Sequence, residues 1–142
     1  MSTPADTVRA FLNALALRDV DAAMSVVDGS VTVTVHPLGV RDGGSEDLRA
    51  MLAELVAAFP DLRLTVRQVV ETGPVVTAEL KVEGTQATDY AGVVNQEKHL
   101  DVDQAWRFTV RDDHIAGLDA YWCQNQLYRR LAVKRLDQIA IV

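Results

Sequence analysis

The stretch LDVDQAWRFTVR, residues 100–111, decides the fold. Apolar and polar residues alternate along it, and this period of two is typical of a β-strand that buries one of its faces. The core face would carry Leu100, Val102, Gln104, Trp106, Phe108 and Val110, and the opposite face Asp101, Asp103, Ala105, Arg107 and Thr109. We therefore expect a long strand with one buried face and one polar face.

Further strands are predicted on both sides of this stretch. The same alternation predicts strands over residues 31–36, 62–70, 75–84 and 115–122. Gly73-Pro74 and Asp112-Asp113 are typical turn sequences between neighbouring strands. Most of the strands thus follow one another closely in the second half of the chain.

Helices are predicted mainly in the first half of the chain. Thr3 can cap one before Pro4, and Asp19 can cap a shorter one that Asp28-Gly29 ends. A third is predicted from its cap, Ser45, to Pro60, and a short one over residues 124–133 follows the last strand. The apolar tail, residues 139–142, is expected to need a packing partner. This order predicts an α+β fold in which a curved antiparallel sheet wraps around helices.

Length and charge exclude several classes of protein. The 142 residues are expected to form one domain, residues 1–142, and the net charge of −6 disfavours nucleic acid or an anionic membrane as partner. No apolar run approaches the ~20 residues of a membrane span, and the N-terminus has no export signal. The single Cys123 cannot form an internal disulfide, and no Cys or His pair has zinc spacing. We therefore expect a cytoplasmic protein without a metal ion or other cofactor.

Gln104 is the one polar residue on the predicted core face of residues 100–111. A buried amide costs about 1–3 kcal/mol when it is left unpaired, so Gln104 needs a partner. The partner could be structural, which means a protein group or a buried water molecule. Alternatively, it could be a bound ligand.

Two ionisable residues, His36 and Asp119, stand at informative places on the predicted strands. His36 ends the strand over residues 31–36, in which Val31, Val33 and Val35 share one face and Thr32, Thr34 and His36 share the other. A neutral imidazole at the rim of the enclosed space could act as a general base, or it could be a solvated strand end. Asp119 lies between residues that face inward, so it is either a catalytic acid or the partner of an Arg on the sheet exterior.

Aromatic residues suggest a pocket, and the absence of familiar motifs limits its chemistry. Trp106, Trp122 and Tyr90 could line an aromatic pocket or fill the core. No phosphate-binding loop, dinucleotide fingerprint, zinc-protease motif or nucleophile elbow is present, and Cys123 has no evident His partner. A pocket that positions and polarises a small molecule remains.

Four segments carry a resemblance to a known family. They are VRAFLNALALRDVDAA at residues 8–23, VHPLGV at 35–40, FPDL at 59–62 and WRFTVRDDHI at 106–115. In order and spacing they resemble the nuclear-transport-factor-2-like superfamily, most closely its polyketide-cyclase and ketosteroid-isomerase branches, over residues 6–131. The resemblance implies a cone-shaped, strongly bent antiparallel sheet wrapped around N-terminal helices, an α+β barrel with an apolar pocket at its mouth. It also implies a homodimer that pairs through the outer face of the sheet.

Residue by residue, the resemblance places the following side chains at the site. His36 stands where the isomerases have their carboxylate base, and Gln104 where they have an oxyanion donor and the cyclases also have Gln. Phe11 replaces a Tyr of the isomerases, and Trp106 replaces a His of some cyclases. The catalytic Asp of the cyclases aligns with Ala120, one residue from Asp119.

The function implied by the resemblance is that of a cofactor-independent enzyme acting on a hydrophobic carbonyl compound, by cyclisation, isomerisation or dehydration. His36 is expected as the base and Gln104 as the neutral donor, with Asp119 as a further catalytic candidate. The expected substrate-binding residues are Phe11, Tyr90, Trp106, Phe108, Leu118 and Trp122. The alternative is a non-catalytic ligand-binding or accessory dimerisation domain of the same fold.

Overall fold

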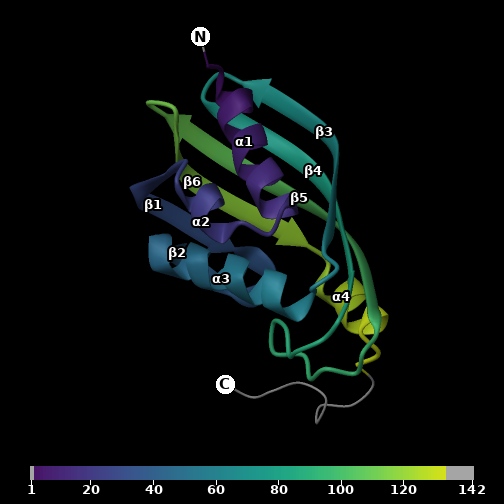
Figure 1. Cartoon of the computed structure of the whole chain (residues 1–142). Coiled ribbons are helices and arrows are strands. Elements are labelled where there is room, and N and C mark those ends of the chain that lie inside the picture. The colour runs from purple at the N-terminus through teal and green to yellow at the C-terminus, as the bar shows by residue number, and fades with distance from the viewer. Residues whose placement is uncertain (1, 134–142) are drawn as a thin grey trace.

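A computed structural model of the chain describes residues 2–133. Their elements in chain order are α1 (Pro4–Ala16), α2 (Val20–Met24), β1 (Val27–Val35), the 3-10 turn η1 (His36–Leu38), β2 (Val40–Gly43), α3 (Ser45–Ala58), β3 (Arg63–Thr72), β4 (Val75–Thr85), β5 (His99–Arg111), β6 (His114–Trp122) and α4 (Gln124–Arg130). The predicted α+β fold is confirmed, and the long strand predicted from residues 100–111 is β5 (Figure 1). The predicted tail at residues 139–142 lies outside the described residues.

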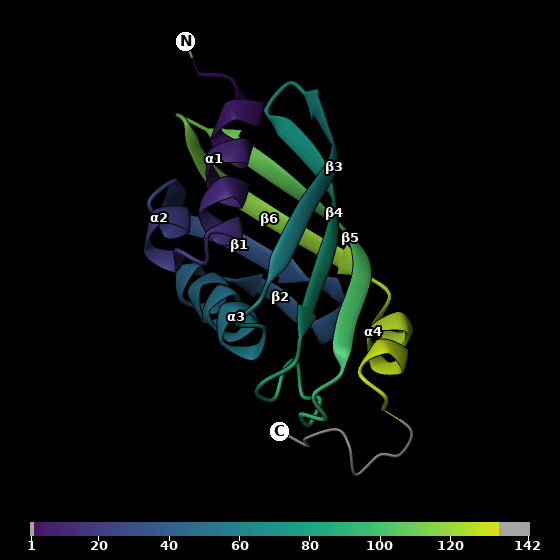
Figure 2. The ribbon, with the colours of Figure 1, turned by 45° about the vertical axis from the view of Figure 1, so that its right-hand side comes forward.

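Within residues 2–133 the strands form one curved sheet in the order β2-β1-β6-β5-β4-β3. Neighbouring strands run antiparallel except β1 and β6, which are parallel. The expectation of a purely antiparallel sheet is therefore wrong for this one pair, because β1 and β6 lie far apart in the chain and no hairpin fixes their relative direction. Since β2 and β3 are edge strands, the sheet is strongly bent but is not a closed barrel (Figure 2).

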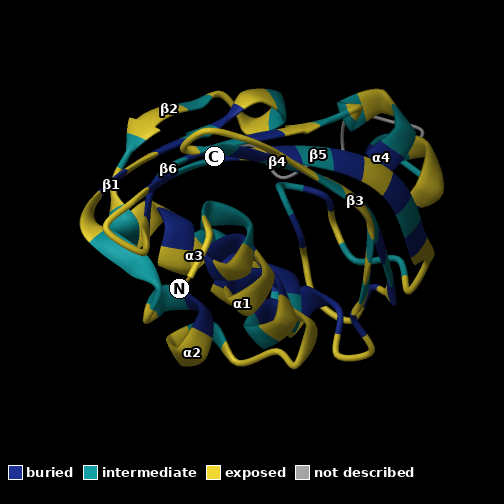
Figure 3. Cartoon of the chain, turned by 90° about the horizontal axis from the view of Figure 1, so that it is seen from above, coloured by how far each residue is buried: buried dark blue, intermediate teal, exposed yellow. Residues whose placement is uncertain are grey.

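The helices α1, α2 and α3 lie on one side of the sheet, which curves around them (Figure 3). The helix α1 turns an apolar stripe toward the sheet, with Val8, Phe11, Leu12 and Leu15 all buried. The inner face of β5 and β6 supplies the other half of this core, as the alternation predicted. We call this side of the sheet the concave face and the opposite side the outer face.

The helix starts follow from local capping, with one correction. The Thr3 hydroxyl accepts from the Asp6 backbone N–H, and Asp6 accepts from the Thr3 N–H in return; these bonds to Thr3 lower the pKa of Asp6. Asp19 caps α2 as predicted. Ser45 is not the cap of α3: the cap is Gly44, whose N–H donates to Asp47 Oδ2 at 2.8 Å.

The remaining differences from the predicted elements lie where turn signals are close together. The helix α2 ends at Met24, and β1 begins at Val27 rather than at residue 31. The short edge strand β2 was not predicted, because its four residues are too few to show alternation. The Asp112-Asp113 turn is confirmed, with φ of 52° and 60°, values that suit the turn of a β-hairpin.

None of the helices in residues 2–133 is both long enough and apolar enough to cross a lipid bilayer.

Candidate functional site

Gln104 lies on the concave face of β5, among apolar neighbours. Its register partners are Leu80 on β4 and Trp122 on β6, and only 5% of its surface is exposed. The Trp106 indole, two residues further along β5, donates its Nε1–H to Gln104 Oε1 at 2.8 Å. The predicted need for a partner is thus met by a protein group at the carbonyl end of the amide.

Three aromatic rings, of which Trp106 is one, pack together on the concave face. Phe11 of α1 contacts Phe108 with ring centroids 5.6 Å apart and Trp106 with centroids 6.4 Å apart. The Trp106 and Phe108 centroids are 6.3 Å apart, and all three side chains are buried. Leu118, the register partner of Phe108, is buried as well. These four residues, expected to bind substrate, therefore form core packing beside Gln104 in this structure.

The other two expected substrate-binding residues are placed differently. Trp122 is half-buried, and its indole donates to Gln124 Oε1 at 2.8 Å. Tyr90 lies in the segment between β4 and β5 and packs edge-on against Phe59, with centroids 5.1 Å apart. Burial, and secondarily the negative charge of Glu54, raises the pKa of Tyr90 far above its ordinary value. Tyr90 is therefore a neutral phenol in the folded protein.

A cleft of about 190 Å³ opens on the concave side between α3 and the β1–β2 edge. Its lining is Val33, Val35, Leu38, Val40, Asp47, Ala50, Met51 and Glu54. Both carboxylates are engaged by backbone: Asp47 accepts from the Gly44 N–H, and Glu54 accepts from the Ala91 N–H at 2.6 Å. The cleft is smaller than the roughly 300–1,000 Å³ of ordinary ligand pockets.

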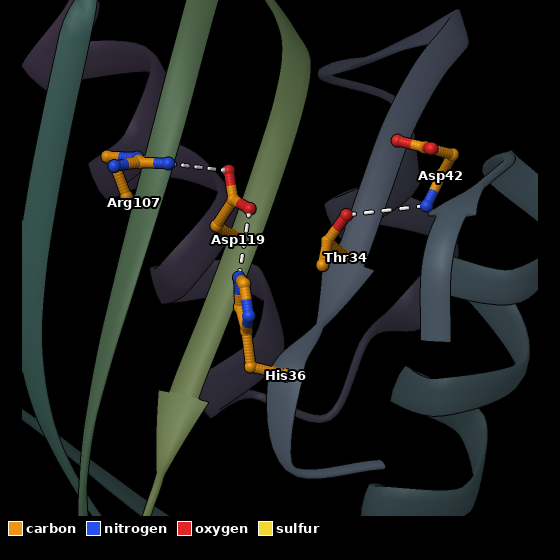
Figure 4. Close-up of polar contacts among 5 residues, drawn as sticks. All are labelled: Thr34, His36, Asp42, Arg107 and Asp119. Atoms are coloured by element: carbon orange, nitrogen blue, oxygen red, sulfur yellow. Dashed lines mark hydrogen bonds and ion pairs between the residues drawn. The ribbon is translucent and has the colours of Figure 1, made fainter. Parts of the chain in front are cut away.

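The ionisable residues singled out in the sequence meet on the outer face instead. His36 Nε2 lies 3.2 Å from Asp119 Oδ1, and Arg107 Nη2 lies 3.2 Å from Asp119 Oδ2 (Figure 4). The His36 ring also stacks on Tyr121, with centroids 4.2 Å apart and planes 12° apart. The strand registers explain this meeting, since Asp119 of β6 stands opposite Arg107 of β5 and opposite Thr34 of β1.

The expectation that His36 and Gln104 share one cavity is wrong. Side chains alternate between the two sides of a strand, and Asp119, the partner of His36, has the opposite parity to Ala120, which faces Trp106. The sheet therefore lies between the imidazole and the amide. Of the two readings of Asp119, the pairing with an Arg on the sheet exterior is confirmed.

A wide depression of about 570 Å³ lies next to this cluster. Its lining is Arg67, Glu79, Leu80, Asp103, Gln104, Ala105, Tyr121, Trp122 and Cys123. Ala105 is flanked in register by Glu79 and Tyr121, so its short side chain leaves the space open. No sequence pattern predicted this depression, and the one available signal was Ala105 on an otherwise polar strand face.

No group of three or more His, Cys, Asp or Glu side chains within residues 2–133 is arranged to hold a metal ion.

The comparisons with known proteins support the fold. Residues 5–129 match the family model described as SnoaL-like polyketide cyclase. A search of the curated proteins gives no match.

Solved structures share the fold at low sequence identity. AclR from Streptomyces galilaeus, named as a candidate hydroxylase, has a TM-score of 0.81 at 15% identity and covers 93% of this chain and 97% of its own. A SnoaL-like polyketide cyclase from Agrobacterium tumefaciens has a TM-score of 0.76 at 21% identity and covers 92% and 99%. A protein of ketosteroid isomerase-like fold from Catenulispora acidiphila, in complex with trimethylamine, has a TM-score of 0.75 at 19% identity and covers 94% and 96%.

Proposed function

Because the chain belongs to the SnoaL-like polyketide cyclase family, we propose that it is a cofactor-independent enzyme that cyclises or isomerises a hydrophobic carbonyl compound on the concave side of its sheet. One observation carries this proposal: Gln104 is an almost fully buried amide on an otherwise apolar strand face. An amide N–H in a site without water stabilises negative charge that develops on a carbonyl oxygen.

The reaction class follows from what the concave face lacks. Among residues 2–133, the buried polar side chains are Thr7, Gln86 and Gln104, and the one buried group that titrates is the Tyr90 phenol. No buried carboxylate or imidazole is thus available there as a strong base. We therefore propose a substrate that is already acidic, such as a β-dicarbonyl compound, whose ring closure depends mainly on how the pocket folds it.

The same lack of a buried base favours a second candidate function, ligand binding without chemistry. The two functions differ in one observable, since a binder would be stabilised by its ligand and would leave the ligand unchanged. A catalyst would also accelerate exchange of the CH₂ protons that lie between the two carbonyl groups. Water or buffer base takes the proton, and the Gln104 N–H stabilises the enolate that remains.

The test uses 1-phenylbutane-1,3-dione as a probe in deuterated buffer, with exchange of its central CH₂ followed by NMR. We expect the protein to accelerate exchange above the buffer rate, and we expect Gln104→Met to remove most of that acceleration. Gln68→Met, at an exposed glutamine of β3, is the matched control and should exchange the probe like the wild type. Thermal stabilisation by the probe without accelerated exchange would favour the binding function. If the probe neither stabilises the protein nor exchanges faster, both functions are refuted.

A further inference from the structure

The hydrogen bond between Trp106 and Gln104 fixes which end of the amide is free. An indole N–H can donate but cannot accept, so it pairs only with the carbonyl end of a glutamine. Gln104 Oε1 therefore faces Trp106 at 2.8 Å, and the Nε2 end, with its two N–H donors, is directed away from the indole. This orientation follows from the chemistry of the two groups, since a flipped amide would place donor against donor.

The indole itself is held firmly in place. Trp106 is buried, and its ring contacts Phe11 of α1 and Phe108 of the same strand. Gln104 and Trp106 are two residues apart on β5, so both side chains lie on the concave face. Packing against two aromatic rings therefore keeps the Trp106 N–H aimed at Gln104 Oε1.

The free end of the amide has no acceptor. Within residues 2–133, the one fully buried side-chain polar atom without a partner is Gln86 Oε1. Gln104 Nε2, for which the structure shows no hydrogen bond, therefore keeps access to solvent. An amide N–H that is not used within the protein and is reachable from solvent can donate to water or to a ligand. Its register neighbours, Leu80 and the half-buried Trp122, are apolar side chains that cannot accept a strong hydrogen bond but can pack against a flat hydrocarbon.

We propose that Trp106 is a positioning residue that locks the Gln104 amide with its N–H donors toward the ligand. The site thereby selects planar apolar compounds that present an oxygen acceptor, a carbonyl or an enolate, at this point. It discriminates against compounds of the same shape that lack the acceptor. This inference rests on the proposed function in so far as it places the ligand on the concave face.

The test compares two ligands of nearly the same shape, 2-acetylnaphthalene and 2-isopropenylnaphthalene, in which C=CH₂ replaces C=O. Each ligand is titrated into the full chain, and the NMR signals of the side-chain N–H groups give its dissociation constant. We expect the ketone to bind about tenfold more tightly than the alkene, as one hydrogen bond to a neutral acceptor allows. The Gln104 Nε2 signals should shift on ketone binding, and the Trp106 Nε1–H signal should remain protected from exchange.

The variant Trp106→Phe keeps an aromatic ring and removes the indole donor. We expect it to lower the ketone-to-alkene ratio to about twofold or less, because the amide is then free to turn. The ratio of the two dissociation constants is insensitive to a general loss of affinity or stability, because such a loss would weaken the binding of both ligands equally. Gln68→Met is the control and should leave the ratio unchanged.

The outcomes separate this inference from the proposed function. Equal binding of the two ligands by the wild type, binding of neither, or an unchanged ratio in Trp106→Phe would overturn the positioning role. Selective binding of the ketone without accelerated proton exchange of the diketone probe would refute catalysis and leave the positioning role supported.

Discussion

The two faces of the sheet differ in the polar side chains that they carry. On the outer face, His36, Arg107 and Asp119 form a partly exposed ionic cluster. On the concave face, the same strands β5 and β6 present apolar residues and one amide. Water solvates charges on the outer face at little cost, whereas an ionised group in the core would lose several kcal/mol of hydration. The residues with the most familiar catalytic chemistry therefore lie on the face opposite to the proposed site.

The largest expected effect comes from deleting a ring of the concave face. Phe108→Ala should lower the free energy of unfolding by about 3–5 kcal/mol, because it removes a buried side chain that packs against Phe11 and Trp106. Thr109→Ala, the next residue on the opposite face, should cost about 0.5 kcal/mol. Urea denaturation measures both. Similar losses for the two variants would contradict the division into a packed face and a solvated face.

The second prediction places a carboxylate on the concave face. Ala120→Asp puts an acid beside Trp106, its register partner, and should cost about 2–4 kcal/mol at pH 7. Burial raises the pKa of such an acid in the folded state. Relative to the wild type, the stability of the variant is therefore highest below the unfolded-state pKa of about 3.9, and it falls as the pH rises through the higher folded-state value.

The measurement is the difference in unfolding free energy between Ala120→Asp and wild type from pH 4 to pH 8. The difference should grow with pH. Thr109→Asp, with its carboxylate on the outer face, is the control and should show no such growth. A deficit that is independent of pH would mean that the new carboxylate escapes to water and that the concave face is less enclosed than its burial indicates.

The third prediction concerns the outer face as a whole, which we propose to pair two copies of the chain. Its depression is floored by Ala105, and Tyr121 beside it is exposed. We expect a dimer at micromolar concentration in sedimentation velocity, and Ala105→Arg should weaken it at least tenfold because the new side chain fills the depression. Ala53→Arg, on an exposed position of α3, should leave the dimer intact. A wild-type protein that sediments as a monomer would refute the proposal.

Strand parity could be predicted from the sequence, and strand partners could not. The alternation assigned the side chains of residues 100–110 in β5 to their correct faces, and the hairpins followed from Gly73-Pro74 and Asp112-Asp113. The parallel pairing of β1 with β6 joins segments more than eighty residues apart, and no local pattern encodes it. The order of helices and strands predicted a curved sheet around helices, and the resemblance to a family added the cone shape.

The error about His36 shows how these two sources of information can conflict. The alternation in residues 31–36 already placed His36 with Thr32 and Thr34, away from the three buried valines. The resemblance placed it at a base position inside the cone, and the structure agrees with the alternation. The meeting of His36 with Asp119 and Tyr121 depends on strand pairing, so it could not be read from either segment alone.

The fourth prediction uses His36 to test the difference between the outer and the concave face of the sheet. His36→Ala should change the diketone exchange rate by less than about twofold, because the sheet separates the imidazole from Gln104. It should lower the unfolding free energy by at most about 1 kcal/mol, since the ion pair with Asp119 is partly exposed. The two measurements are proton exchange by NMR and urea denaturation. A large loss of exchange activity in this variant would place the chemistry on the outer face and refute the site proposed here.

The smallest expected effect concerns an exposed carboxylate that accepts a hydrogen bond from the backbone. Asp61 Oδ1 accepts from the Thr85 N–H at 2.7 Å, and this bond holds the pKa of Asp61 below its ordinary value of 3.8. A lowered folded-state pKa contributes stability that is present above the unfolded-state value and is lost as the pH falls through the folded-state value. Asp61→Asn removes the titration but leaves an acceptor for the same N–H. The wild type should therefore lose stability relative to Asp61→Asn between pH 4 and pH 2.5, as urea denaturation at each pH would show. A constant difference over this range would mean that Asp61 gains nothing from the bond in its charged form.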